Sequence, residues 1–249
     1  MSENSAYSPY STPQPLSLVN RVVAAAARRW RVIFGVVFGS VVLVPFLAPV
    51  FMQLGLPGMA SLVYFVYSFL CHQLPERSFF LFGPQAMYSL EELQKAGADP
   101  TNMFVLRKFI GSPELGWKVA WSDRMVWMYS SMLVFGLLWR PILNKAKGLP
   151  WWGLALFLVP MAVDGTSHFI SDLAGMGQGF RASNTWLAEL TGYAFSPSFY
   201  AGDAFGSFNS WTRLLTGFLF GLGVVWFSFP YIEGTMLDTI RQIRKRSPL

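Results

Sequence analysis

The chain has 249 residues, of which 53% are hydrophobic, 17% aromatic and only 13% charged. An average soluble domain carries about 25% charged residues, so the composition indicates an integral membrane protein with no room for a second sizeable soluble domain. The formal charge is +6, but the basic residues cluster beside apolar segments, as in contacts to anionic lipid heads, and no nucleic-acid partner is expected. A single cysteine excludes an intrachain disulfide and a zinc ribbon.

The first 20 residues are rich in Ser, Pro, Tyr and Asn at their start and predict a disordered tail. The first apolar run, 32–54, is long enough for a transmembrane helix, which needs about 20 apolar residues, and too long for a cleavable signal peptide. Pro45 and Pro49 are expected to bend its outer half. The second run, 59–70, is short and fits either a tilted span or a re-entrant helix.

Three further apolar runs cover residues 125–139, 151–170 and 214–232. Together the runs predict an all-α, polytopic helical membrane protein with four or five transmembrane helices, one of them short or re-entrant. Two pairs of glycines at the spacing that allows close helix packing lie in the first and last runs, at Gly35/Gly39 and Gly217/Gly221.

Basic residues give an orientation, because cytoplasmic loops carry an excess of Lys and Arg. They precede the first run, occupy 140–147 and fill a basic tail at 241–249, so both termini are predicted to be cytoplasmic in a multi-pass protein of the cell membrane. Two basic clusters on the same side of the membrane need an even number of crossings between them. Three apolar runs separate the first two clusters, so one run, the short 59–70, should not cross the membrane. The alternative is five full crossings with one basic cluster on the opposite side.

This topology gives one helical membrane domain over 21–240, with outer loops at 84–120 and 171–210. The first loop holds a capping-box helix start at 89–95 and an amphipathic stretch at 104–110, and is predicted to form a small cap on the membrane surface. Residues 184–195 resemble 209–220 at an offset of 25, either through a local duplication or by chance in so aromatic a chain.

Several polar residues interrupt the ends of the apolar runs, where such groups are costly and often functional. Cys71, His72 and Gln73 follow the second run; Cys71 either packs as a small apolar residue or forms a pair with a distant histidine, while His72 and Gln73 either cap the helix end or line a site. Asp123 is placed to cap the third span, and Arg124 is expected to pair with it, with Glu76 or with a lipid phosphate.

The fourth span contains Asp164 and His168, four residues apart on one helix face. This spacing lets a carboxylate orient an imidazole for proton transfer or metal binding, although a structural polar seam between helices explains it equally well. Near the start of the last span, Asn209 and Arg213 stand at the same membrane face. Arg213 would form an anion-attracting cluster with Arg77 and Arg124 if the three converge, and Thr216 is expected to bond back to its helix.

These motifs occur in an order that resembles one family. The motifs are Cys71-His72-Gln73, Arg77-Ser78, an arginine at a span start, Asp164-Gly165, and Asn209 with Arg213 and Thr216-Gly217. The chain from about 68 to 222, without its loops, resembles the prokaryotic membrane-protein family known as domain of unknown function 2085. The resemblance implies a helical membrane fold and no particular reaction. This chain departs from the family pattern at Ser122 and Asp123, where a cysteine is usual, and at His168, where glutamine is usual.

Two functions fit these observations. The first is a non-catalytic scaffold or accessory subunit of a membrane complex, with membrane lipids, membrane proteins or a second copy of the chain as partners. The alternative is an intramembrane hydrolase or transferase acting on a lipid or polyprenyl phosphate. In it Asp164 and His168 would be catalytic, and the anion or substrate would be bound by residues from three segments: Cys71, His72, Gln73, Arg77, Arg124, Asn209 and Arg213.

The sequence names no cofactor, and His72, His168, Asp164 and Cys71 fit no recognised metal-ligand spacing. A transporter is less favoured, since no matched pair of broken helices occurs in two halves.

Overall fold

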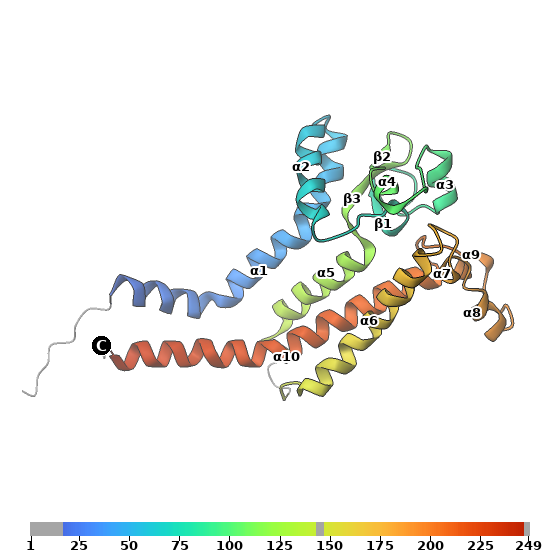
Figure 1. Cartoon of the computed structure of the whole chain (residues 1–249). Helices are drawn as coiled ribbons and strands as arrows, with labels where there is room; N and C mark the ends of the chain where they lie inside the picture. The colour runs from blue at the N-terminus through green and yellow to red at the C-terminus, as the bar shows by residue number, and fades with distance from the viewer. Residues whose placement is uncertain (1–16, 143–146, 247–249) are drawn as a thin grey trace, which may run out of the picture.

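The computed structural model describes residues 17–142 and 147–246, and helices dominate it (Figure 1). The four long helices are α1 (Leu18–Gln53), α5 (Asp123–Leu138), α6 (Trp151–Asp172) and α10 (Phe208–Arg246). The shorter helical segments are α2 (Pro57–Ser68), η1 (Pro75–Arg77), α3 (Leu90–Lys95), α4 (Met103–Leu106), α7 (Phe180–Ser183), α8 (Thr185–Leu190) and α9 (Pro197–Tyr200). The all-α polytopic architecture is confirmed, with one small sheet in addition.

Three helices, α1, α6 and α10, are long and apolar enough to cross a membrane. Helix α5 has 16 residues, or roughly 24 Å, somewhat less than the roughly 30 Å hydrocarbon core. It nevertheless lies along α10 and α1 within the bundle. Helix α2 has 12 residues and folds back against the end of α1 through a turn at Gly55, whose φ is 71°. Its length and its hairpin with α1 match the short helix that the sequence predicts.

Helices α1 and α10 are both longer than a bilayer requires. They have 36 and 39 residues, or roughly 54 and 58 Å. Ser17 caps α1 by accepting a hydrogen bond from the backbone of Asn20, so residues 18–20 of the predicted disordered tail are helical, and residues 1–16 lie outside the described residues. The predicted basic tail likewise continues α10 as far as Arg246, and 247–249 lie outside the described part.

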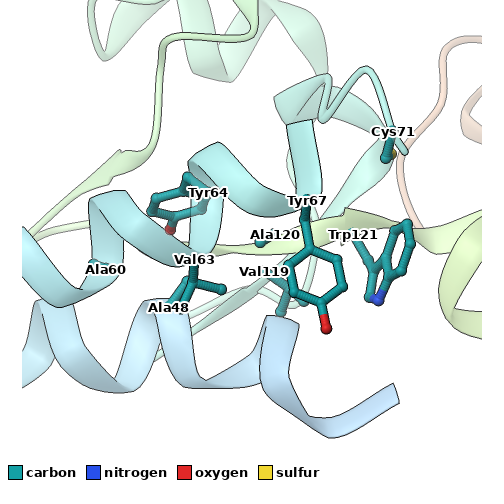
Figure 2. Packing of buried hydrophobic residues seen from close by; sticks show 9 residues of the cluster. All are labelled: Ala48, Ala60, Val63, Tyr64, Tyr67, Cys71, Val119, Ala120 and Trp121. Atoms are coloured by element: carbon teal, nitrogen blue, oxygen red, sulfur yellow. The ribbon is translucent and has the colours of Figure 1, made fainter. Parts of the chain in front are cut away.

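The hairpin of α1 and α2 packs against a β-strand. Ala48 of α1, Val63 and Tyr67 of α2, and Val119 and Trp121 of the strand share one buried cluster (Figure 2). The Trp121 indole N–H donates to the Val41 carbonyl at 3.0 Å. Pro45 and Pro49 lie inside α1 beside this contact. Proline has no N–H to donate, so the strand packs against the part of α1 that lacks some of its helical hydrogen bonds.

The three-stranded antiparallel sheet was not predicted from the sequence. It has the order β1-β3-β2, with β1 (Ser78–Leu81), β2 (Gly111–Ser112) and the longer β3 (Gly116–Ser122). Strand β2 has two residues and β1 has four, too short for an alternating pattern to be read in the sequence. The predicted amphipathic stretch 104–110 holds only one helical turn, α4, and the rest of the outer loop folds over the sheet with α3.

Glycines bring α10 against α5 and α6. A Cβ on Gly217 would meet the α5 backbone, 3.1 Å from Met128 N, and one on Gly223 would collide with Phe157 of α6. The predicted close-packing pair Gly217/Gly221 is therefore used. The other pair, Gly35/Gly39 of α1, differs. A Cβ on Gly35 would have only the Leu137 side chain nearby, at 3.4 Å, and one on Gly39 would have no neighbour within 4 Å among the described atoms.

The elements separate by position along the bundle (Figure 1). The start of α1 and the end of α10, both rich in basic residues, lie at one end. The hairpin, the sheet and the short helices α3, α4 and α7–α9 lie at the other. This second group covers the start of α5, the end of α6 and the start of α10. It is called the outer cap below, because the sequence predicts its loops on the outer side.

Candidate functional site

Four arginines and four aspartates join the outer cap to the long helices through a chain of ion pairs, called the outer network. Its members are Arg77, Arg124, Arg181, Arg213, Asp123, Asp164, Asp172 and Asp203. With every member ionised the charges cancel, four against four. The ion pairs divide the network into two groups, which are described in turn.

The first group, called the Asp203 group, contains three aspartates and two arginines. Arg77 binds Asp172 of α6 through two hydrogen bonds of 2.7 Å and Asp203 through one of 3.0 Å. Arg213 of α10 also donates to Asp203, and its Nε lies 2.8 Å from both oxygens of Asp123, the first residue of α5. The cap loop that holds Asp203 is thereby tied to three helices.

The charges around Asp203 explain how a carboxylate survives burial there. Burial alone would raise the pKa of Asp203, but the neighbouring Arg77 and Arg213 guanidinium groups hold it below its usual value. The carboxylate therefore remains ionised over the physiological pH range.

The second group, called the Asp164 group, contains two arginines and one aspartate. Asp164 accepts a hydrogen bond of 2.7 Å from Arg124 on one oxygen and another of 2.7 Å from Arg181 on the other. The Arg124 guanidinium therefore reaches Asp164 rather than Asp123 or Glu76, which the sequence had suggested as its protein partners. Arg181 also donates to Thr212 at 3.1 Å.

His168 lies one helical turn after Asp164 on the same face of α6, as the spacing predicts, but its closest polar partner is an arginine. Its Nε2 lies 3.1 Å from the Arg181 Nη2 and 3.8 Å from the nearest Asp164 oxygen. Arginine can only donate, so Nε2 must accept, which places the hydrogen of the neutral ring on Nδ1. This Nδ1 has no hydrogen-bond partner among the described residues.

Two asparagines secure the loop that carries Arg181. Asn184 and Asn209 both donate to the Arg181 carbonyl, at 2.8 and 2.6 Å, and Asn184 also donates to the Asn209 side chain. These asparagines are the equivalent positions of the two similar sequence segments. Asn209 therefore positions a loop from a buried place at the start of α10, where its side chain also bonds Gly202.

The three residues after α2 have separate environments. Cys71 is buried in the apolar cluster and its sulfur lies 3.4 Å from the Ser122 backbone N (Figure 2). Gln73 is buried in a left-handed conformation and donates to the Tyr64 carbonyl at 2.9 Å, whereas His72 is exposed. The structure thus keeps Cys71 and Gln73 in packing roles and leaves His72 at the edge of a cavity.

Two of the cavities between the cap and the helices have both Arg77 and Arg124 in their lining. The larger, of about 350 Å³, lies between η1, α4 and the end of α6, and Arg77, Arg124, His168 and Asp172 line it together with apolar residues. A smaller one of about 110 Å³ is lined by residues that include Cys71, His72 and all three predicted arginines, Arg77, Arg124 and Arg213. Arg77, Arg124 and Arg213 therefore lie around one cavity, but each is already bound to a carboxylate.

Metal binding was left open by the sequence. Among residues 17–142 and 147–246, no three His, Cys, Asp or Glu side chains are grouped so that they could hold a metal ion.

A buried glutamate and a buried lysine lie beside the network in the cap. Within the described part of the chain neither carboxylate oxygen of Glu76 has a hydrogen-bond partner, and burial raises its pKa to about 7. Lys118 of β3 donates to the carbonyls of Gln73 and Arg107, and burial lowers its pKa to about 7. Each group is therefore close to half protonated at neutral pH.

These two shifts predict opposite slopes of stability with pH. A folded pKa of about 7 for Glu76, above its unfolded value of 4.5, stabilises the fold at low pH and loses that contribution as pH rises from 4.5 through 7. For Lys118 the unfolded state binds more protons between about 7 and 10.5, so stability recovers over that interval.

The change Glu76→Gln is therefore expected to raise the melting temperature at pH 8 more than at pH 5, because glutamine never has to be buried with a charge. Thermal unfolding of the purified protein in detergent across this pH range measures the difference. Glu91→Gln is the control, since Glu91 is exposed and pairs only with the exposed Lys95. An equal shift at both pH values would contradict the titration of Glu76.

Sequence analysis missed three members of the site: Arg181, Asp203 and Asn184. They lie in the outer loop 171–210, where Gly, Ser and aromatic residues obscure any periodic pattern. The small number of charged residues in that loop could have indicated them. Only four occur there, and three of these, Asp172, Arg181 and Asp203, belong to the network.

The fold and the site together define a polytopic helical membrane protein with a buried ion-pair network under an outer cap. Residues 114–227 match a family described as predicted membrane protein (DUF2085). The chain is also 30% identical over 165 residues to an uncharacterized protein of Methanocaldococcus jannaschii, an alignment that covers 62% of this chain and 79% of the relative. No solved structure matches the chain.

The chain belongs to the DUF2085 family of predicted membrane proteins. The matched range contains all of α5 and α6 and the first half of α10, and it includes seven of the eight members of the outer network. Glu76 and Arg77 lie outside it.

Proposed function

We propose that this protein is a non-catalytic scaffold or accessory subunit of a membrane complex. The observation that carries the proposal is the mutual neutralisation of the outer network, in which each arginine is bonded to an aspartate and each aspartate to an arginine. Such a network fixes where the cap sits on α5, α6 and α10. Buried charges of this kind favour one arrangement over others more than they add stability.

The same observation weighs against an intramembrane enzyme acting on a lipid phosphate. A general base must be within reach of the proton it takes. Both oxygens of Asp164 accept from arginines, and the Nε2 of His168 already faces the Arg181 guanidinium. Arg213, one of the three proposed anion ligands, is 1% exposed and bonded to two aspartates. These groups support a fixed structure better than a reaction cycle.

The surface supports contact with other membrane components. Helices α1 and α10 exceed the length of a span, and their basic ends lie at the same end of the bundle. We assign this end to the cytoplasmic side, where basic residues meet anionic lipid heads, and both termini with it. The hairpin helix α2 carries an exposed apolar face that includes Leu62, Phe65 and Phe69. This face suits a second membrane protein or another copy of the chain.

The proposal predicts that assembly survives the loss of the candidate catalytic groups. His168→Gln should leave a stoichiometric complex intact in native mass spectrometry after extraction in mild detergent, because glutamine can still accept from Arg181. Leu62→Arg on the α2 face should disrupt the complex, since a charge would enter the contact. The scaffold proposal would be refuted by one result. In it the wild-type chain, purified alone, releases phosphate from a lipid phosphate, and the His168→Gln variant does not.

A further inference from the structure

The larger cavity differs from the rest of the outer network in its charge. Its lining contains Arg77 and Arg124 but only one acidic residue, Asp172, and His168 is neutral in the tautomer derived above. The Asp164 group behind it carries two arginines and one aspartate. The lining and the Asp164 group each contain one more arginine than aspartate, so one positive charge is in excess beside the cavity. The Asp203 group has one more aspartate than arginine, but most of its carboxylates lie away from the cavity lining.

Hydrogen bonding shows the same imbalance. The Nε of Arg124 and the Nδ1 of His168 have no partner among the described residues, and both residues line the cavity. Both nitrogens are donors, and a buried donor without a partner costs free energy. His168 is only 2% exposed, so its ring belongs to the built wall of the cavity rather than to a mobile surface. Both nitrogens are themselves buried, so they show that this wall is short of acceptors and do not open into the cavity.

The opposite wall of the cavity is apolar and continues onto the outside of the bundle. Leu74, Met103 and Met176 line the inside, while Phe169 and Leu173 of α6 line the mouth and are 63% and 72% exposed. Phe169 and Leu173 lie at the end of an apolar helix that crosses the membrane. A ligand with a polar head in the cavity could keep an apolar tail in the bilayer.

We propose that this cavity binds one singly charged phosphodiester or carboxylate group, of the kind that an anionic lipid headgroup carries. One negative charge balances the excess on the lining, whereas a dianionic phosphate monoester would exceed it. The oxygens of the ligand accept from Arg77 and Arg124, whose side chains are 15% and 19% exposed and which remain bonded to Asp172 and Asp164. The site needs no reaction and is independent of the scaffold proposal.

The test is native mass spectrometry of the full chain, titrated in mild detergent with phosphatidylglycerol or with diacylglycerol of the same acyl chains, which lacks the anionic group. We expect one phosphatidylglycerol to be retained per chain, at least about tenfold more tightly than diacylglycerol, the difference that a charge-assisted hydrogen bond gives. Addition of glycerophosphoglycerol, the phosphodiester headgroup of phosphatidylglycerol without its acyl chains, identifies the source of the group. Displacement by this soluble compound indicates a free anion, and persistence indicates a membrane lipid.

Two variants test the location. Arg124→Gln removes the excess charge and should abolish the preference, but it also breaks the bond to Asp164 and can impair folding. Leu173→Trp instead fills the mouth from an exposed position without removing a charge, and should weaken retention about tenfold or more. Leu190→Trp, at an equally exposed position of the cap that lines neither cavity, is the matched control. Equal retention of both lipids, or retention that Leu173→Trp leaves unchanged, would overturn the proposal.

Discussion

Replacing Asp123 by alanine is expected to destabilise the protein by about 3–5 kcal/mol, because the change leaves the Arg213 guanidinium buried without the carboxylate that binds its Nε. Asp123 is fully buried and Arg213 is 1% exposed, so water cannot replace the lost oxygens. Arg213 keeps Asp203, which limits the loss. Unfolding in mixed micelles with increasing denaturing detergent measures the difference in free energy between the variant and the wild-type chain.

Asp238→Ala is the matched control for this prediction. It removes the carboxylate of an Arg241–Asp238 pair at 3.2 Å in which both side chains are more than 60% exposed. Exposed pairs contribute at most about 1 kcal/mol, so this variant should unfold close to the wild-type chain. Similar losses for the two variants would show that the outer network gives no more stability than a surface pair.

The second large effect is expected at Gly221, where α10 touches α5. A Cβ there would collide with the Ser131 hydroxyl and come within 2.8 Å of Met132 N and 2.9 Å of Met128 O. Backbone atoms cannot move aside as a side chain can, so the helices must separate. Gly221→Ala should therefore cost about 1–3 kcal/mol, and Gly221→Leu more.

Gly39→Ala provides the comparison, because no described atom lies within 4 Å of a Cβ at that position of α1. Alanine is the better helix former, so this variant should be neutral or slightly more stable. Both glycines belong to pairs with the same sequence spacing. If the two variants had equal stability in the same micelle assay, the contact between α10 and α5 would be looser than the structure indicates.

The apolar runs predicted the long helices well, because a helix in a bilayer must satisfy its backbone internally and is therefore marked by length and composition. They predicted the ends of α1 and α10 poorly. The basic segments at both ends continue as helix, since Lys and Arg are good helix formers and nothing in 21–31 or 233–246 interrupts the chain.

The sheet and the network members Arg181 and Asp203 could not be predicted for a different reason. Strand β3 is held by contacts with Val41 of α1 and Tyr64 of α2, which are distant in sequence. Asp203 and Arg181 acquire their partners only when the loop 171–210 folds over the helices. By contrast Asp164, His168 and Arg213 were found because a charged residue in an apolar run is visible without any knowledge of its neighbours.

Helix α10 joins the two ends of the bundle as one helix that contains Pro230. Arg213, one turn from its start, is held by the cap, and roughly 50 Å of helix separates it from Arg246 at the far end. A rotation of about 5° around the Arg213 anchor would therefore sweep the basic end through about 4 Å. In mechanical terms α10 would act as a lever whose pivot is the carboxylate pair of Asp123 and Asp203, with Pro230 as the point where it can bend.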